Sequence, residues 1–220
     1  MRLASFLARV ALGLTTSAVD ITFEVELARH RGPILFVANH VSSADSWVAL
    51  AITASLRRNP AVLAQARVLR SFPWLARLGF ISLSKKNPAS VLEAFQETSR
   101  RASDDPDLAI WFYPQGTHSP SSAARSPLQP GILGLLRMLP EHTLVVPVAF
   151  HYFVFRQPRM AICAMVAKPI ADAGLMAKSG RGALLDIDTH LTRASANAAN
   201  QVAGAAARIK FPFEREDSTL

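Results

Sequence analysis

Three continuous apolar runs constrain the fold of this chain more than any other feature. They cover residues Ile34–Ala38, Leu108–Tyr113 and Leu144–Phe150. Runs of this length without polar alternation are typical of strands that are buried on both faces, as in a parallel sheet covered by helices. Helical patterns lie between them, over Trp47–Leu56, Pro88–Arg101 and Ile132–Leu139. The alternation predicts an α/β fold with a mostly parallel central sheet flanked by helices.

Further strands and one long helix complete this expectation. Ile21–Leu27 alternates between apolar and polar residues, which indicates a strand with one wet face. Phe80–Leu83 and Met160–Val166 are read as two more strands, and the Ala-rich tail Ala183–Ile209 as a helix. The sequence contains no internal repeat and no clean domain boundary. We therefore expect a single domain over residues 20–220, preceded by an amphipathic N-terminal segment over residues 1–19.

Composition narrows the class of protein and its partners. Half of the residues are hydrophobic and 18% are charged, which excludes an intrinsically disordered chain. The single cysteine, Cys163, excludes an intrachain disulfide and a cysteine-rich metal site. The net charge of +8 favours an anionic partner, and at this level nucleic acid, anionic lipid and an acidic protein are equal alternatives.

The N-terminus has an amphipathic pattern. Leu3, Phe6, Leu7, Val10 and Leu14 recur at helical spacing, but the apolar stretch is too short for the roughly 20 residues that cross a bilayer. Three interpretations remain from the residues alone: an interfacial membrane helix, a secretory signal that ends near Ala18, and a core helix. Arg9 inside the apolar stretch counts against the signal.

Two of the buried runs lead into unusual polar loops, and parallel sheets bind ligands beyond the carboxyl ends of their strands. In the first loop, His40 and Asp45 lie about 140° apart on a continuous helix and could not meet. They can meet if His40 stays on the loop and a helix starts after it, with Ser42 or Ser43 as the N-cap. Asp45 would then orient His40 as a general base, the logic of a triad whose hydroxyl comes from the substrate. The alternative is a hydrogen-bonded loop histidine beside a capping aspartate.

The second loop, from Tyr113 to Ser119, contains a Pro-Gln-Gly-Thr turn. Gly116 permits a backbone that approaches a ligand closely, and main-chain amides there could bind an anion or an oxyanion. Lys85, Lys86 and Arg67 could add positive charge on the same face, although a run of charges is more often only a solvated surface.

Taken in order, these loops resemble the glycerolipid acyltransferase family, which includes the 1-acylglycerol-3-phosphate O-acyltransferases. The family motif N-H-x-x-x-x-D is matched by Asn39, His40 and Asp45. Residues 113–119, Y-P-Q-G-T-H-S, match F-P-E-G-T-R-S in part, and residues 145–149 match its V-P-V-A type strand. Looser matches are Gly131–Leu136 to a Gly-led helix, residues 167–170 to a G-K-P-I-like strand end, and residues 67–85 to the second motif.

The resemblance implies transfer of a fatty acyl group from acyl-CoA or acyl carrier protein to a lipid hydroxyl, without a metal or another cofactor. His40 and Asp45 would be catalytic. The acceptor or oxyanion would be bound by Gln115, Gly116, Thr117, His118 and Lys85, with Asn39, Ser42 and Ser43 in support.

Departures from the family pattern bear on the acceptor. Gln115 replaces Glu, His118 replaces Arg, and Lys85 stands where Arg is expected. Arginine binds phosphate in a bidentate manner that neither histidine nor lysine reproduces. Lysophosphatidate is therefore the family default, but we expect that phosphate is not the main handle and that another lysolipid or a hydrophobic alcohol is an alternative acceptor.

The resemblance also favours the membrane-surface interpretation of the N-terminal helix, since both substrates partition into lipid. We expect a peripheral or monotopic protein at the cytoplasmic face of the inner membrane, with acyl carrier protein as an optional partner and no nucleic acid. The competing class is a noncatalytic lipid-binding homologue. A nucleic-acid binder would show interleaved aromatic and basic residues, and this sequence does not.

Overall fold

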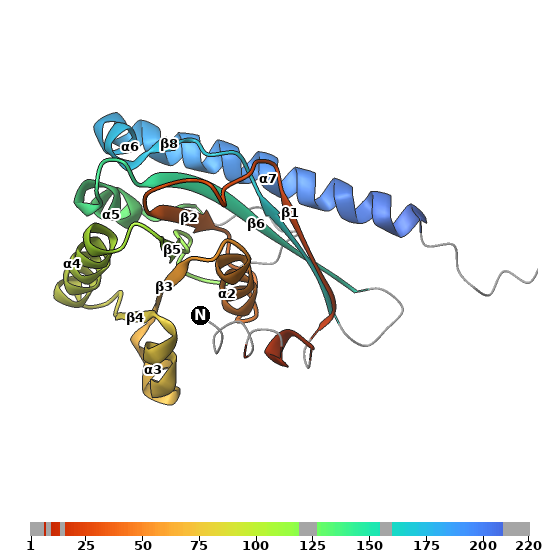
Figure 1. The fold of residues 1–220 in the computed structure, drawn as a ribbon, viewed down its shortest axis with the longest axis horizontal. Helices are drawn as coiled ribbons and strands as arrows, with labels where there is room; N and C mark the ends of the chain where they lie inside the picture. Colours follow the sequence, from red (N-terminus) through yellow and green to blue (C-terminus); the bar gives the residue numbers. More distant parts are fainter. Residues whose placement is uncertain (1–6, 8–9, 14–15, 119–126, 155–159, 209–220) are drawn as a thin grey trace, which may run out of the picture.

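The computed structural model describes residue 7 and residues 10–13, 16–118, 127–154 and 160–208. Its centre is a sheet of eight strands in the order β1-β7-β6-β2-β5-β3-β4, with the short β8 beside β6 (Figure 1). The strands are β1 (Thr16–Phe23), β2 (Ile34–Ala38), β3 (Asn59–Gln65), β4 (Phe80–Leu83), β5 (Leu108–Phe112), β6 (Leu144–Val154), β7 (Met160–Val166) and β8 (Ala171–Asp172).

Most of the pairings in the sheet are parallel, as predicted. β6, β2, β5, β3 and β4 form one parallel block, β7 and β8 pair with β6 in the antiparallel direction, and β1 runs parallel to β7. All five residues of β2 and of β5 are buried, which agrees with their continuous apolar sequence. The predicted α/β class is therefore confirmed.

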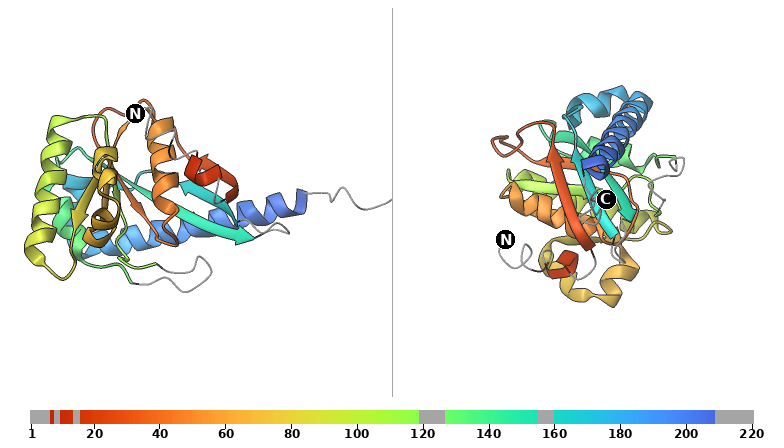
Figure 2. Two further views of the ribbon diagram at one scale, coloured as in Figure 1. Left: turned by 90° about the horizontal axis from the view of Figure 1, so that it is seen from below. Right: turned by 90° about the vertical axis from the view of Figure 1, so that its right-hand side faces the viewer.

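Helices cover both faces of the sheet, as the two views of Figure 2 show. Alternate residues of β2 divide the core: Phe36 packs in a cluster with α2, whereas Leu35 and Val37 pack in a second cluster with α4 and α5. The helical elements are α2 (Asp45–Ser55), α3 (Ala66–Ser71), the 3₁₀ helix η1 (Pro73–Leu78), α4 (Pro88–Asp104), α5 (Gly131–Met138), α6 (Ala173–Ser179) and α7 (Arg181–Arg208).

Several local expectations need correction. The first strand runs from Thr16 to Phe23 rather than from Ile21 to Leu27, because its partner β7 ends where Phe23 pairs with Val166. β3 begins at Asn59, soon after the predicted helix Trp47–Leu56, and no strand was predicted there. α3 and η1 were not predicted, since elements this short leave little periodicity in a sequence.

The predicted N-terminal helix lies partly outside the described residues. Leu7 and residues 10–13 are helical, Leu12 is buried in the core cluster that contains α2, and Val10 is exposed. No helix among the described residues is long and apolar enough to cross a membrane.

The topology positions the two polar loops together. β2 and β5 are neighbours in parallel register, with Val37 opposite Phe112. Their carboxyl ends therefore meet at one edge of the sheet, and the loops that start at Asn39 and Tyr113 leave side by side.

Candidate active site

His40 and Asp45 are in contact, as their spacing predicted. His40 Nδ1 lies 2.8 Å from Asp45 Oδ2, with His40 on the loop and Asp45 in the first turn of α2. The predicted serine N-cap is wrong: the N-cap is Ala44, and no side chain caps it. Asp45 itself closes the loop, because its Oδ2 accepts hydrogen bonds from the backbone N–H of Val41 at 2.7 Å and of Ser42 at 3.0 Å.

Asp45 is fully buried, and its second oxygen also has a partner. Tyr152, near the end of β6, donates its hydroxyl to Asp45 Oδ1 at 2.5 Å. Burial, followed by the nearby Asp45 carboxylate, raises the pKa of Tyr152, so this hydroxyl stays protonated and remains a donor. Sequence reasoning missed Tyr152, since nothing local indicates that a residue 107 positions away reaches the first motif.

Asn39 and Gln115 hold the His40 loop from two sides. The Asn39 side chain donates to the Phe150 carbonyl at 2.9 Å and accepts from the Phe150 N–H at 2.7 Å, which fastens the end of β2 to β6. Gln115 is buried, and its Oε1 accepts from the His40 N–H at 2.8 Å. Gln115 is not among the residues that line the neighbouring cavity, so its contact positions His40.

Two aromatic rings flank the His40 imidazole. Tyr113 stacks on it with ring centroids 4.5 Å apart, and His118 meets it edge-on at 4.1 Å. The pKa of His118 lies below its ordinary value of 6.5, first because of burial and then because of the neighbouring His40. His118 is therefore mostly neutral at neutral pH.

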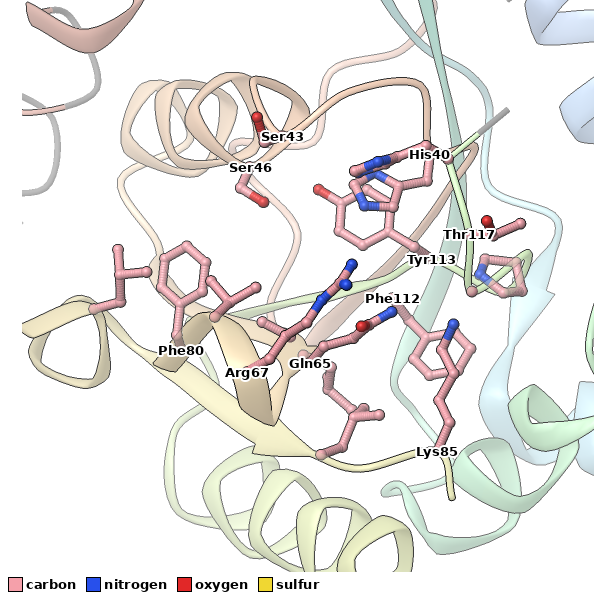
Figure 3. Close-up of a pocket in the computed structure, with 18 of the residues that line it drawn as sticks. His40, Ser43, Ser46, Gln65, Arg67, Phe80, Lys85, Phe112, Tyr113 and Thr117 are labelled. Carbon is pink, nitrogen blue, oxygen red and sulfur yellow. The ribbon is translucent and has the colours of Figure 1, made fainter. Parts of the chain in front are cut away.

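A cavity of about 660 Å³ opens beside His40. Its polar end contains Ser43, Ser46, Gly116, Thr117 and His118. Figure 3 shows the Arg67 guanidinium pointing toward His40 and Tyr113 from the opposite wall, with Lys85 rising toward Thr117. The apolar end is made mainly by Trp47, Leu63, Val68, Phe72, Trp74, Leu75, Phe80, Leu83, Val91, Phe95 and Phe112.

Gly116 sits at a tight point of the second loop. Its φ is +65°, and a side chain there would meet Lys85 Nζ at 2.6 Å. Its N–H donates to the Tyr113 carbonyl at 3.0 Å and so closes the turn. The amide that was expected to bind an anion is thus already used, whereas the Thr117 side chain and Lys85 face the cavity.

The predicted site residues divide into two groups. His40, Ser43, Lys85, Gly116, Thr117 and His118 line the cavity, whereas Asn39, Ser42, Asp45 and Gln115 lie behind it and position the loop. No cluster of three potential metal ligands occurs among the described residues. The arrangement offers an oriented imidazole at the polar end of an apolar cavity, which suits proton abstraction from a hydroxyl on an amphipathic substrate.

Comparison with known proteins agrees with this chemistry. No curated protein matches the sequence. The fold is similar to that of the 1-acyl-sn-glycerophosphate (LPA) acyltransferase PlsC from Thermotoga maritima, with a TM-score of 0.64 and 14% sequence identity over 90% of this chain and 79% of that one. The family model described as Acyltransferase matches residues 20–151, which is more than half of the chain. This range contains both motif loops and all the residues that line the cavity. The chain therefore belongs to the acyltransferase family and is an acyltransferase enzyme.

Proposed function

We propose that this enzyme moves a fatty acyl group from a thioester, acyl-CoA or acyl carrier protein, to a hydroxyl of a lysophospholipid-like acceptor in phospholipid biosynthesis. Lysophosphatidate is the default acceptor by family. The observation that carries the proposal is the 2.8 Å contact between His40 and Asp45 at the polar end of an apolar cavity.

In the proposed reaction, each nitrogen of His40 has its own role. The Asp45 carboxylate accepts a hydrogen bond from Nδ1–H, which leaves Nε2 free to take the proton of the acceptor hydroxyl. The hydroxyl oxygen then attacks the thioester carbonyl carbon, and the carbonyl oxygen becomes the oxyanion of a tetrahedral intermediate. When the C=O bond re-forms, the C–S bond breaks, and the leaving thiolate receives the proton from His40. Thr117 and Lys85 are the cavity groups that could donate to the oxyanion, because the Gly116 amide is bonded within its turn.

The apolar end of the cavity is suited to the acyl chain. The volume of the whole cavity falls within the range of about 300–1,000 Å³ that small-molecule sites occupy. Aromatic and aliphatic side chains make most of the cavity wall. The proposal needs no metal or organic cofactor, since both reacting groups belong to the substrates.

Arg67 and Lys85 support an anionic group on one substrate. Both line the cavity, and no carboxylate among the described residues forms an ion pair with either of them. Burial, and then the charge of Arg67, lower the pKa of Lys85. A bound phosphate between the two cations would relieve this repulsion, whether it belongs to the acceptor or to the donor.

The first experiment replaces His40 with alanine. We expect acylation to fall by at least about a thousandfold, the order of magnitude lost when a catalytic base is removed. Lipid mass spectrometry of the products and circular dichroism of the fold are the measurements, and His190→Ala on α7 is the matched control. Full turnover by His40→Ala would refute the proposal, and lipid binding by an inactive wild type across a donor panel would favour the noncatalytic homologue.

A second acceptor class, a lipid alcohol without phosphate, is favoured by His118. A mostly neutral imidazole is a weak phosphate ligand where the family has arginine. We expect His118→Arg to raise the preference for lysophosphatidate over an uncharged acceptor by about tenfold, the value of one charge-assisted hydrogen bond. The difference in acceptor preference between His118→Arg and the wild type should shrink at acidic pH, because His118 gains a proton and a positive charge there. A strong wild-type preference for lysophosphatidate that His118→Ala abolishes would contradict this expectation.

A further inference from the structure

A second feature of the molecule lies outside the reaction chemistry. We define the α3–η1 surface as Arg67, Arg70, Phe72, Trp74 and Arg77. Figure 1 shows that α3 projects from the sheet beyond β4. Phe72 is 52% exposed and Trp74 is 41% exposed. Both side chains also line the same cavity. Exposed apolar side chains that gather in one place indicate an interaction site, whereas single scattered ones are common on folded domains.

The charge on this surface is of one sign. The sequence contains no Asp or Glu between Asp45 and Glu93, while Arg67, Arg70 and Arg77 are all exposed. None of the three forms an ion pair within the part of the chain that the structure describes. On α4, by contrast, Arg100 and Arg101 both pair with Glu97. The α3–η1 surface therefore keeps its positive charge available for an external anion.

The α3–η1 surface also borders the opening of the cavity. Arg67, Phe72 and Trp74 are exposed to solvent and at the same time line the cavity, and Trp74 stacks on Trp47 of α2 at 6.2 Å between ring centroids. In Figure 1 and in the right-hand view of Figure 2, α3 and helical residues 10–13 lie on the lower side of the molecule, opposite α7. A flat partner on this side would meet the cavity entrance directly.

We propose that the α3–η1 surface docks on an anionic lipid bilayer, with Phe72 and Trp74 at the depth of the headgroups and the arginines on lipid phosphates. Tryptophan concentrates at membrane interfaces, and cationic side chains are attracted to anionic leaflets. The complementary charge and the adjacent lipid-sized cavity favour a bilayer over an acidic protein or a nucleic acid. The inference rests on the proposed function in one respect, that the substrates reside in lipid.

Vesicle binding by the full chain tests the charge. We expect tight binding to vesicles that contain anionic phosphatidylglycerol and weak binding to neutral phosphatidylcholine vesicles. Arg70→Gln/Arg77→Gln removes two charges that lie outside the cavity lining, and it should weaken binding to the anionic vesicles by about 30-fold. The control, Arg181→Gln/Arg193→Gln, removes two exposed charges from α7 and should weaken binding less than threefold. Equal losses in the two double variants would overturn the docking surface.

A site-specific probe tests the depth of insertion. Ser71→Cys, between the arginines and the aromatic pair, can be labelled selectively with an environment-sensitive dye, because the only native thiol, Cys163, is buried. The emission should shift to the blue with anionic vesicles, whereas the same dye on Ala196→Cys of α7 should not shift. Absence of a shift at position 71, or a larger shift with RNA or an acidic peptide than with vesicles, would overturn the proposal.

Neither readout requires turnover. Both are repeated in the His40→Ala background, where vesicle binding should be unchanged. If the wild-type enzyme is inactive but still binds vesicles through α3–η1, only the proposed function is refuted. If it is active and its vesicle binding does not depend on the α3–η1 residues, only the docking surface is refuted.

Discussion

At the residue scale, Asp45 determines how the histidine is held. Its two oxygens accept from four donors, namely His40 Nδ1, Tyr152 and the backbone amides of Val41 and Ser42. A fully buried carboxylate needs such partners, because an unpaired charge in the interior is costly. The same bonds fix the angle at which His40 faces the cavity.

Tyr152 is therefore expected to act as a positioning residue. Tyr152→Phe removes one hydrogen bond to a buried charge, which is worth about 1.5 to 3 kcal/mol. We expect kcat to fall by about tenfold while KM for both substrates stays within twofold, because Tyr152 does not line the cavity. Steady-state kinetics measures this division, and thermal unfolding gives the loss of stability. An unchanged kcat in a destabilised variant would show that Tyr152 only supports the fold.

The contacts that sequence could predict at this scale are the local ones. His40 and Asp45 are five positions apart, so only one arrangement of loop and helix lets them meet, and that arrangement is present. The partners of Asn39 and Asp45 on β6 are more than a hundred positions away. These contacts require β6 to lie beside β2, and no sequence motif predicts that pairing. The roles assigned to the site residues remain predictions.

At the scale of elements, long patterns were predictable and short ones were not. The buried runs of β2 and β5 and the periodic helix α4 appear within a few residues of their predicted limits. β3 starts in a polar segment, since its place between β5 and β4 outweighs the weak strand preference of Asn59 and Pro60. α3 has no buried residue, so its sequence lacks the apolar stripe by which helices are recognised.

Gly79 joins η1 to β4 and packs closely against β3. Its φ is +90°, and a Cβ would lie 2.1 Å from the Pro60 carbonyl oxygen, which is main chain and cannot move aside cheaply. Gly79→Ala should lower the free energy of unfolding by about 2 to 4 kcal/mol, from left-handed strain plus overpacking. Gly182→Ala in α7, where the added Cβ meets only ordinary contacts, should cost nothing. Urea denaturation of both variants measures this difference. Equal denaturation midpoints for Gly79→Ala and Gly182→Ala would contradict the prediction.

For the whole molecule, the sheet separates two kinds of packing. The face that carries α2 also holds η1 and the described N-terminal helical residues, whereas α4, α5, α6 and α7 close the other face. The cavity, the exposed aromatic pair and the unpaired arginines of α3–η1 all lie toward the strand edge from which the two motif loops leave. A net charge alone could not indicate this, because composition does not say where the charge lies.

The net charge of +8 leads to a prediction for the whole enzyme. If the enzyme docks on a bilayer through exposed cations, a higher salt concentration should weaken the docking. The reason is that the screening length falls from about 8 Å at 0.15 M salt to about 3 Å at 1 M salt. Acylation of an acceptor embedded in anionic vesicles should therefore fall at least tenfold across this range. A short-chain acceptor that is dispersed as monomers reaches the cavity without docking, and its rate should change less than threefold. Measuring both rates on one enzyme preparation separates surface binding from chemistry, and parallel loss of the two would place the salt effect in the catalytic cavity at Arg67 and Lys85.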